Sequence, residues 1–231
     1  MKKLEVACFS PEDAKLALES GADRIEFCAD YASGGVTPDL DEFILLRSQF
    51  PDAKIHVMIR PRDGDFVYSA YKIDLMSSQI QDFESAGADG FVFGVLHADN
   101  TVNVESCREL LSAIKNRKER EAVFHRAIDV VPNQEEAFQQ LIELGFDGVL
   151  SSGGAKNAVD GSEQLTKLQN TFGQQIEIIA GGGVRANNLD AVLATGVEWI
   201  HSAAWDADEQ KIRLEEMKRL VGMVKSMVGS K

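Results

Sequence analysis

A short pattern, Gly21-Ala22-Asp23, decides the fold, because it recurs as Gly87-Ala88-Asp89, Gly145-Phe146-Asp147 and Gly196-Val197-Glu198. Each copy follows a helical pattern and precedes an apolar run that is typical of a strand. Glycine adopts the left-handed conformation that ends a helix, and the acidic residue follows in the short loop before the next strand. The copies recur at intervals of about 50 to 66 residues, and one βα unit takes roughly 30 residues, so each interval holds two units. Four copies therefore predict about eight units.

The apolar runs around these marks predict the strands. They lie near residues 4–8, 24–28, 55–60, 90–94, 122–125, 148–151, 176–180 and 198–202. Eight strands that alternate with helices in 231 residues predict an α/β protein with one domain over residues 1–231. Its architecture is a single (β/α)8 TIM-type barrel, which typically takes about 250 residues. A doubly wound open sheet is the alternative.

Three helices have recognisable signals. Ser10-Pro11-Glu12-Asp13 combines a capping hydroxyl, a proline in the first turn and acidic residues at the positive end of the helix dipole. A second helix is expected over about 133–144, and the last over about 209–228, each with an apolar face.

Composition excludes several classes of partner. The chain has 24 Lys and Arg against 37 Asp and Glu, and a net charge of -13 repels nucleic acid. No apolar run approaches the roughly 20 residues of a membrane-spanning helix, and Glu5 and Asp13 interrupt the place of a signal sequence. Three cysteines do not make a disulfide framework. We expect a reduced, cytoplasmic protein that binds neither nucleic acid nor membrane. A homo-oligomer is compatible with the sequence.

Polar side chains collect at the carboxyl ends of the predicted strands, where barrels place their active sites. One group suits acid–base chemistry and anion binding: Glu26, Arg60, Arg62, His125 and Asp129, with Arg60 or Arg62 as the anion-binding cation. Glu or His moves protons when its surroundings bring its pKa near neutrality, and Arg binds a carboxylate or phosphate through its planar fork. The alternative is structural, with Glu26, Arg60 and Glu5 in a salt-bridge network that fills the barrel mouth.

Glycine-rich turns after the sixth and seventh strands form a second group. Ser152-Gly153-Gly154 and Gly181-Gly182-Gly183, with Ser202, could bind an anion through Ser152, Gly153, Gly154, Gly182, Gly183 and Ser202. Glycine lets the backbone approach a ligand closely, and free N–H groups supply the donors. The alternative is that these glycines only make tight turns.

A third group could hold a metal ion. Cys28, Glu26, His125 and His201 combine thiolate and imidazole donors that suit Cu(I) or Zn. No closely spaced ligand pair supports this interpretation, and a free cysteine is more often a small buried apolar residue. Cys107 is expected only to pack.

At these residues the sequence resembles the copper homeostasis protein CutC family. The resemblance rests on Gly21 to Cys28, Gly34-Gly35-Val36-Thr37-Pro38, Met58-Ile59-Arg60-Pro61-Arg62 with Gly64 to Ser69, Phe124-His125-Arg126-Ala127, Ser152-Gly153-Gly154, Gly181 to Val184 and His201-Ser202-Ala203, and it spans about residues 4 to 204. It implies a TIM-type barrel, a cytoplasmic location and a role in copper handling. Cu(I) binding is attributed to cysteines, so Cys28 and Cys8 become the candidate metal ligands. No organic cofactor is implied.

The chain departs from this family at Ala7. Members usually carry Cys at that position, whereas Cys8 is one residue further on, where strand alternation turns it to the opposite side of the sheet. Asp63 also replaces a usual glycine, and the segment after Ala204 is shorter than in many members.

Two functions therefore stand side by side. The first is a copper-homeostasis protein that binds Cu(I) weakly or transiently through Cys28 and Cys8. The second is an isomerase-, epimerase- or lyase-like enzyme for a small phosphorylated or carboxylated metabolite. In the enzyme, glycine-rich turns hold the anion, Arg60 orients the substrate, and Glu26 or His125 transfers protons.

Overall fold

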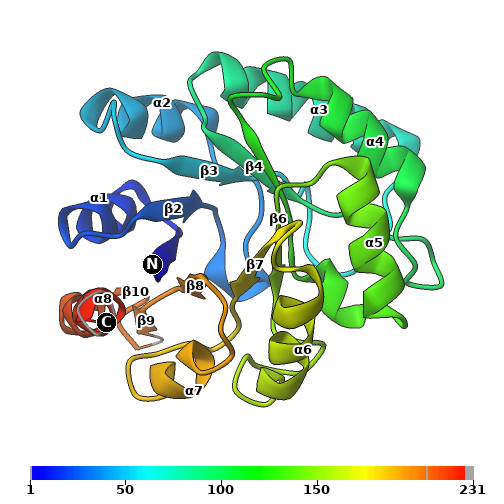
Figure 1. Ribbon diagram of the computed structural model, residues 1–231. Coiled ribbons are helices and arrows are strands. Elements are labelled where there is room, and N and C mark those ends of the chain that lie inside the picture. The colour runs from blue at the N-terminus through cyan, green and yellow to red at the C-terminus, as the bar shows by residue number, and fades with distance from the viewer. Residues whose placement is uncertain (1, 207, 227–231) are drawn as a thin grey trace.

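Eight parallel strands close into a barrel in chain order, and helices cover its outside (Figure 1). The computed structural model describes residues 2–206 and 208–226. Closure is direct, because β1 pairs with β8 as well as with β2. The predicted (β/α)8 barrel is thus confirmed and the open sheet excluded. The strands are β1 (Lys3–Cys8), β2 (Arg24–Phe27), β3 (Ile55–Met58), β4 (Gly90–Phe93), β5 (Glu121–Phe124), β6 (Gly148–Ser151), β7 (Glu177–Ala180) and β8 (Trp199–Ser202).

The first helix begins as its sequence predicts. The Ser10 hydroxyl accepts a hydrogen bond from the Asp13 N–H at 3.1 Å, and Pro11 is the first helical residue. None of the described helices is long and apolar enough to span a membrane. The helices are α1 (Pro11–Glu19), α2 (Leu40–Gln49), α3 (Ala70–Ser85), α4 (Val104–Ala113), α5 (Gln134–Leu144), α6 (Ser162–Phe172), α7 (Leu189–Leu193) and α8 (Leu214–Ser226), with 3-10 turns η1 (Tyr31–Ser33) and η2 (Arg126–Val130).

The predicted start of the last helix at residue 209 is wrong. The segment before α8 forms a small antiparallel pair, β9 (Trp205–Asp206) and β10 (Lys211–Ile212). The Asp206 carboxylate accepts hydrogen bonds from the backbone N–H groups of residues 208 and 209, which makes a turn there. Gln210 then has a left-handed φ of 50°, which a helix does not tolerate. The predicted end near residue 228 lies outside the described residues.

The recurring glycine–acid pattern joins strands in pairs. All four glycines are left-handed, with φ between 88° and 97°. The carboxylate of Asp23 accepts a hydrogen bond from the N–H of Leu4, which belongs to the preceding strand. The carboxylates of Asp89 and Asp147 likewise accept hydrogen bonds from the backbone N–H groups of Ile55 and Ala122, at the starts of β3 and β5. In these three copies the acidic residue connects its own strand to the one before it, which explains why the pattern recurs at every second strand.

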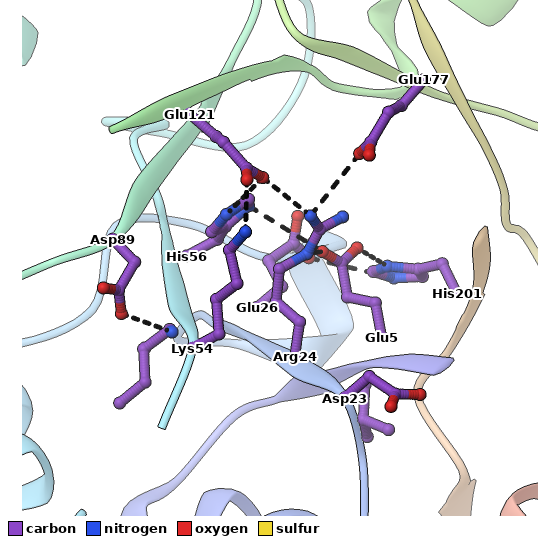
Figure 2. A network of polar contacts seen from close by, with 12 residues as sticks. Glu5, Asp23, Arg24, Glu26, Lys54, His56, Asp89, Glu121, Glu177 and His201 are labelled. Atoms are coloured by element: carbon purple, nitrogen blue, oxygen red, sulfur yellow. Dashed lines mark hydrogen bonds and ion pairs between the residues drawn. The ribbon is translucent and has the colours of Figure 1, made fainter. Parts of the chain in front are cut away.

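A network of charged side chains lies inside the barrel (Figure 2). Arg24 has no exposed surface, and its guanidinium binds Glu5 at 2.5 Å and Glu121 at 3.0 Å, with Glu177 at 3.8 Å. Alternate residues of β1 point outward, where Leu4, Val6 and Cys8 join the apolar core that includes the buried faces of the helices. The barrel therefore has an apolar layer outside its strands, and its interior combines the ion-paired network with an inner apolar cluster that includes Val92, Val123 and Ile179.

We expect Arg24→Met to lower the free energy of unfolding by about 3–5 kcal/mol, because Glu5 loses its guanidinium partner while it stays buried. Lys15→Met is a matched control, since Lys15 makes only an exposed pair with Glu19 at 3.9 Å and such pairs contribute at most about 1 kcal/mol. Urea unfolding followed by circular dichroism measures both variants. Equal losses in the two would show that the Arg24 network does not hold the barrel together.

Candidate functional site

The carboxyl ends of the strands surround a pocket of about 370 Å³. It contains three members of the predicted acid–base group, Glu26, Arg60 and His125, together with Cys28. Its polar wall also includes Arg126, Gly182, Gly183, Arg185, His201 and Ser202, and its apolar wall includes Phe9, Tyr31, Met58, Phe66 and Leu150. Asp129, Ser152, Gly153, Gly154 and Cys8 do not line this pocket. Glu26 and Cys28 both line the pocket, which confirms the strand alternation that predicts them on one side.

Glu26 brings a buried carboxyl group to the pocket. It is 3% exposed, and its Oε2 accepts a hydrogen bond from the Cys28 thiol at 3.4 Å. Its Oε1 is buried and has no hydrogen-bond partner among the described residues. Burial raises the pKa of Glu26, and the nearby charge of His201 opposes that rise only in part. A carboxyl group whose pKa is raised can exchange a proton near neutral pH.

His201 connects Glu26 to the ion pairs below it (Figure 2). Its Nδ1 is 2.7 Å from Glu5 Oε1, and its Nε2 is 3.9 Å from Glu26 Oε2. Burial by itself lowers the pKa of His201, but the hydrogen bond to Glu5 and the charges of Glu26 and Glu5 outweigh it, so the pKa is raised. Arg24 and His201 hold the pKa of Glu5 below its usual range against the effect of burial. The imidazole is thus favoured in its protonated form beside Glu26.

Sequence reasoning considers His201 only as a metal ligand and misses its pairing with Glu5. The two residues stand opposite each other in the register of β1 and β8. β1 and β8 pair only when the barrel closes, so the contact between His201 and Glu5 can be predicted only once closure is known.

Arg60 is a buried cation without a carboxylate partner in the described part of the chain. It is 7% exposed, and the carbonyl oxygens of Ser33, Gly35 and Gly64 accept its hydrogen bonds at 2.8, 3.0 and 3.1 Å. The expected salt-bridge network of Glu26, Arg60 and Glu5 is therefore wrong, because Arg24 occupies the position beside Glu5. The positive charge of Arg60 is left available to an anion in the pocket.

His125 is a neutral hydrogen-bond donor. Its Nδ1 accepts a hydrogen bond from the Ala127 N–H at 3.3 Å, whereas its buried Nε2 has no partner among the residues described. Burial, and after it the charge of Arg60, lowers the pKa of His125 to about 3. A neutral ring that accepts at Nδ1 carries its hydrogen at Nε2.

Asp129 holds the turn after β6 rather than lining the pocket. Its carboxylate accepts hydrogen bonds from the N–H groups of Ser152 at 2.9 Å and Gly154 at 3.1 Å. It also pairs with Arg126 at 2.8 Å, and Arg126 does line the pocket. The Gly153 N–H donates to the Ser151 hydroxyl at 2.8 Å. A carboxylate of the protein itself therefore uses two of the N–H groups that the sequence suggests for an external anion.

Gly182 and Gly183 face the pocket in left-handed conformations, with φ of 98° and 69°. The left-handed φ at Gly182 favours glycine, and a Cβ atom there would also lie 3.1 Å from the guanidinium carbon of Arg126. The Ser202 hydroxyl donates to the Val184 carbonyl at 2.7 Å and accepts from the Ala204 N–H at 3.1 Å. Of the glycine-rich turns, the one after β7 presents its backbone to the pocket.

The two candidate thiol ligands lie on opposite faces of the sheet. Cys28 belongs to the inner apolar cluster, and Cys8 packs in the outer core. Burial raises the pKa of both thiols well above the ordinary range. Cys107 is also free and buried, as expected.

One other group has the spacing of metal ligands. Donor atoms of Glu5, Glu26 and His201 lie within 4.8 Å of one another. A cation there would compete with the Arg24 guanidinium, which already binds Glu5.

Comparisons with known proteins agree with one another. The family model described as "CutC family" matches residues 2–205. The chain is 39% identical to "family protein CutC" of Treponema denticola, over 90% of this chain and 83% of that protein. It is 36% identical to "Copper homeostasis protein cutC homolog" of Caenorhabditis elegans, over 87% of this chain and 80% of that protein. A crystal structure of a CutC protein from Streptococcus agalactiae superposes with a TM-score of 0.82 and 29% identity, covering 88% of this chain and 99% of that one.

The lowered pKa of His125 makes stability depend on pH. The folded state keeps this ring neutral down to about pH 3, whereas the unfolded chain takes up a proton below its ordinary pKa of 6.5. The free energy of unfolding therefore decreases as the pH is lowered from 6.5 towards 3, and this group contributes about 1.4 kcal/mol per pH unit to the decrease. We expect His125→Gln to lose stability less steeply than the wild type between pH 6.5 and 4, measured by urea unfolding. The exposed His97, changed to Gln, serves as the control, and an identical slope in all three proteins would contradict a neutral His125.

Proposed function

The chain belongs to the CutC family, and from that membership we propose that it takes part in copper homeostasis through the pocket at the barrel mouth. The name of the Caenorhabditis elegans relative supports this role. The observation that carries the proposal is the position of Cys28, whose thiol lines the pocket and contacts Glu26 at 3.4 Å. Thiolate sulfur is a ligand that Cu(I) prefers. Copper is here the protein's cargo rather than a resident cofactor.

The donor set fits weak, reversible binding. Cys28 is the only thiol that lines the pocket in the described structure, and Cys8 faces the outer core. Because burial raises the pKa of the Cys28 thiol, Cu(I) must displace a proton to bind it. We therefore assign Cys28 as the thiolate ligand, with Glu26 and His201 as the nearest further donors, and retain Cys8 only as a ligand that would require β1 to rearrange.

The same proposal places the protein in the cytoplasm. Cys8, Cys28 and Cys107 are all free and buried, and unpaired thiols are kept reduced in that compartment.

We expect Cys28→Ser to weaken Cu(I) binding by about tenfold or more, because the pocket loses its thiolate ligand. An anaerobic titration against a chromophoric Cu(I) chelator measures the affinity. Cys107→Ser is the matched control, since Cys107 is equally buried but lies away from the pocket; Cys8→Ser tests the second thiol. Full retention of binding by Cys28→Ser would reject this ligand assignment.

A second function is favoured by a different observation: the pocket joins an unpaired buried cation, Arg60, to a carboxyl group with a free oxygen, Glu26. We propose that it also acts as the active site of an isomerase-, epimerase- or lyase-like enzyme. Its substrate class is a small phosphorylated or carboxylated metabolite, and the volume of about 370 Å³ suits such a molecule.

Each pocket residue then has a role. Arg60 orients the anionic substrate, and the turn containing Gly182 and Gly183 binds its anionic group through backbone N–H groups. Ser152, Gly153, Gly154 and Ser202 shape this anion site from the neighbouring turns, and Asp129 acts by holding Arg126. Glu26 transfers the proton, and His201 beside it can return one.

Arg60→Met should abolish the rise in melting temperature that inorganic phosphate or citrate causes in the wild type, because the buried cation is lost. Arg62→Met is the control, since this half-buried arginine pairs with Asp65 and does not line the pocket, contrary to the alternative that the sequence leaves open. Differential scanning fluorimetry measures the shift. If all three proteins show the same rise, the anion binds elsewhere.

A further inference from the structure

Two buried nitrogen atoms of the pocket have no hydrogen-bond acceptor among the described residues. They are Nε2 of His125 and Nε of Arg60, on side chains that are 3% and 7% exposed. Buried donors that remain unsatisfied are destabilising and uncommon in folded proteins, so a pair of them in one pocket calls for an acceptor. An oxygen atom of a bound anion can supply that acceptor, as can solvent or, for Arg60, the neighbouring Tyr68 hydroxyl.

Both donor side chains pack against Phe66. The guanidinium of Arg60 lies 5.2 Å from the ring centre of Phe66, and the imidazole of His125 lies 4.8 Å from the same ring. Phe66 also lines the pocket. A cation and a neutral N–H donor of the pocket are thus packed against the same aromatic ring.

The hydrogen-bond pattern of His125 restricts what it can do. Its Nδ1 lone pair accepts from the Ala127 N–H, so the ring can donate at Nε2 but has no free lone pair. His125 is therefore excluded as a general base in this state. A neutral imidazole that donates to an oxygen is instead suited to polarise a carbonyl group.

We propose that His125 and Arg60 together form an oxyanion site, and that the substrate is a small anion whose carbonyl oxygen becomes an enolate there. This deepens, and rests on, the second function proposed above. The proton leaves the carbon next to the carbonyl and goes to Glu26; the C–H electron pair forms a C=C bond, and the carbonyl π pair moves to oxygen. His125 Nε2–H and Arg60 hold the resulting oxyanion. On a substrate with a hydroxyl group on the carbon that loses the proton, the hydroxyl proton passes to the oxyanion and Glu26 returns its proton to the former carbonyl carbon. The carbonyl and hydroxyl groups thereby exchange places, which is an isomerisation without any oxidant or reductant.

Oxalate tests the proposal, because this planar dianion resembles an enolate of a 2-oxo acid. We expect oxalate to bind the wild-type protein in calorimetry and to shift the ¹⁵N and ¹H signals of His125 Nε2–H. His125→Ala should weaken oxalate binding by about tenfold or more, since a charged acceptor loses its donor. His125→Gln, which keeps an N–H donor, should recover part of the affinity, and His97→Ala should bind as the wild type does.

Binding of inorganic phosphate distinguishes failure of the oxyanion site from failure of the anion-binding pocket as a whole. If phosphate binds in an Arg60-dependent manner but oxalate does not bind, or binds His125→Ala equally well, the oxyanion site is rejected while the anion-binding pocket stands. If neither anion binds, both proposals fail. The wild-type NMR spectrum decides even where a variant does not fold: a hydrogen on Nδ1 instead of Nε2 would overturn the assignment.

Discussion

The guanidinium of Arg24 is buried inside the barrel, and the remaining structure has to neutralise it. An uncompensated charge in such a place costs several kcal/mol, so its partners must come from other strands. Glu5 on β1 and Glu121 on β5 supply the close contacts, with Glu177 on β7 further away. The same pairing keeps Glu5 ionised, and ionised Glu5 favours the protonated form of His201. The charge beside Glu26 thus follows from an ion pair that lies deeper in the barrel.

The pocket next to this network contains two groups of residues with different chemical roles. Glu26, His201 and Cys28 supply exchangeable protons and a soft ligand, whereas Arg60 and His125 supply hydrogen-bond donors. The chain as a whole has a net charge of -13, yet Arg60, Arg126 and Arg185 all line this pocket. Because Cys28 contacts Glu26, a copper ion on that thiol would occupy the acid–base side. The two proposed functions therefore compete for one space, and occupation of the pocket by copper would block proton transfer by Glu26.

Local signals in the sequence predict much of the barrel. The glycines of the recurring pattern are left-handed because they end helices, and Ser10 caps α1 because its hydroxyl reaches a nearby N–H group. The start of α8 is missed because a turn at Asp206 and a left-handed Gln210 interrupt an otherwise helical pattern. Alternation correctly separates Cys28 from Cys8: Cys8 pairs with Phe27, the residue before Cys28, and successive positions point to opposite faces.

The sequence by itself determined the number and order of the barrel strands, the opposite faces of Cys28 and Cys8, and the membership of Glu26, Arg60, His125 and Cys28 in one pocket. These depend on short-range periodicity and on the common polarity of parallel strands. Only the tertiary structure decided the partners: Arg24 rather than Arg60 binds Glu5, and Asp129 binds the turn after β6. Those contacts join residues that are far apart in the chain. Their distances exist only after the barrel closes, and they determine which charges are neutralised and which remain available to a ligand.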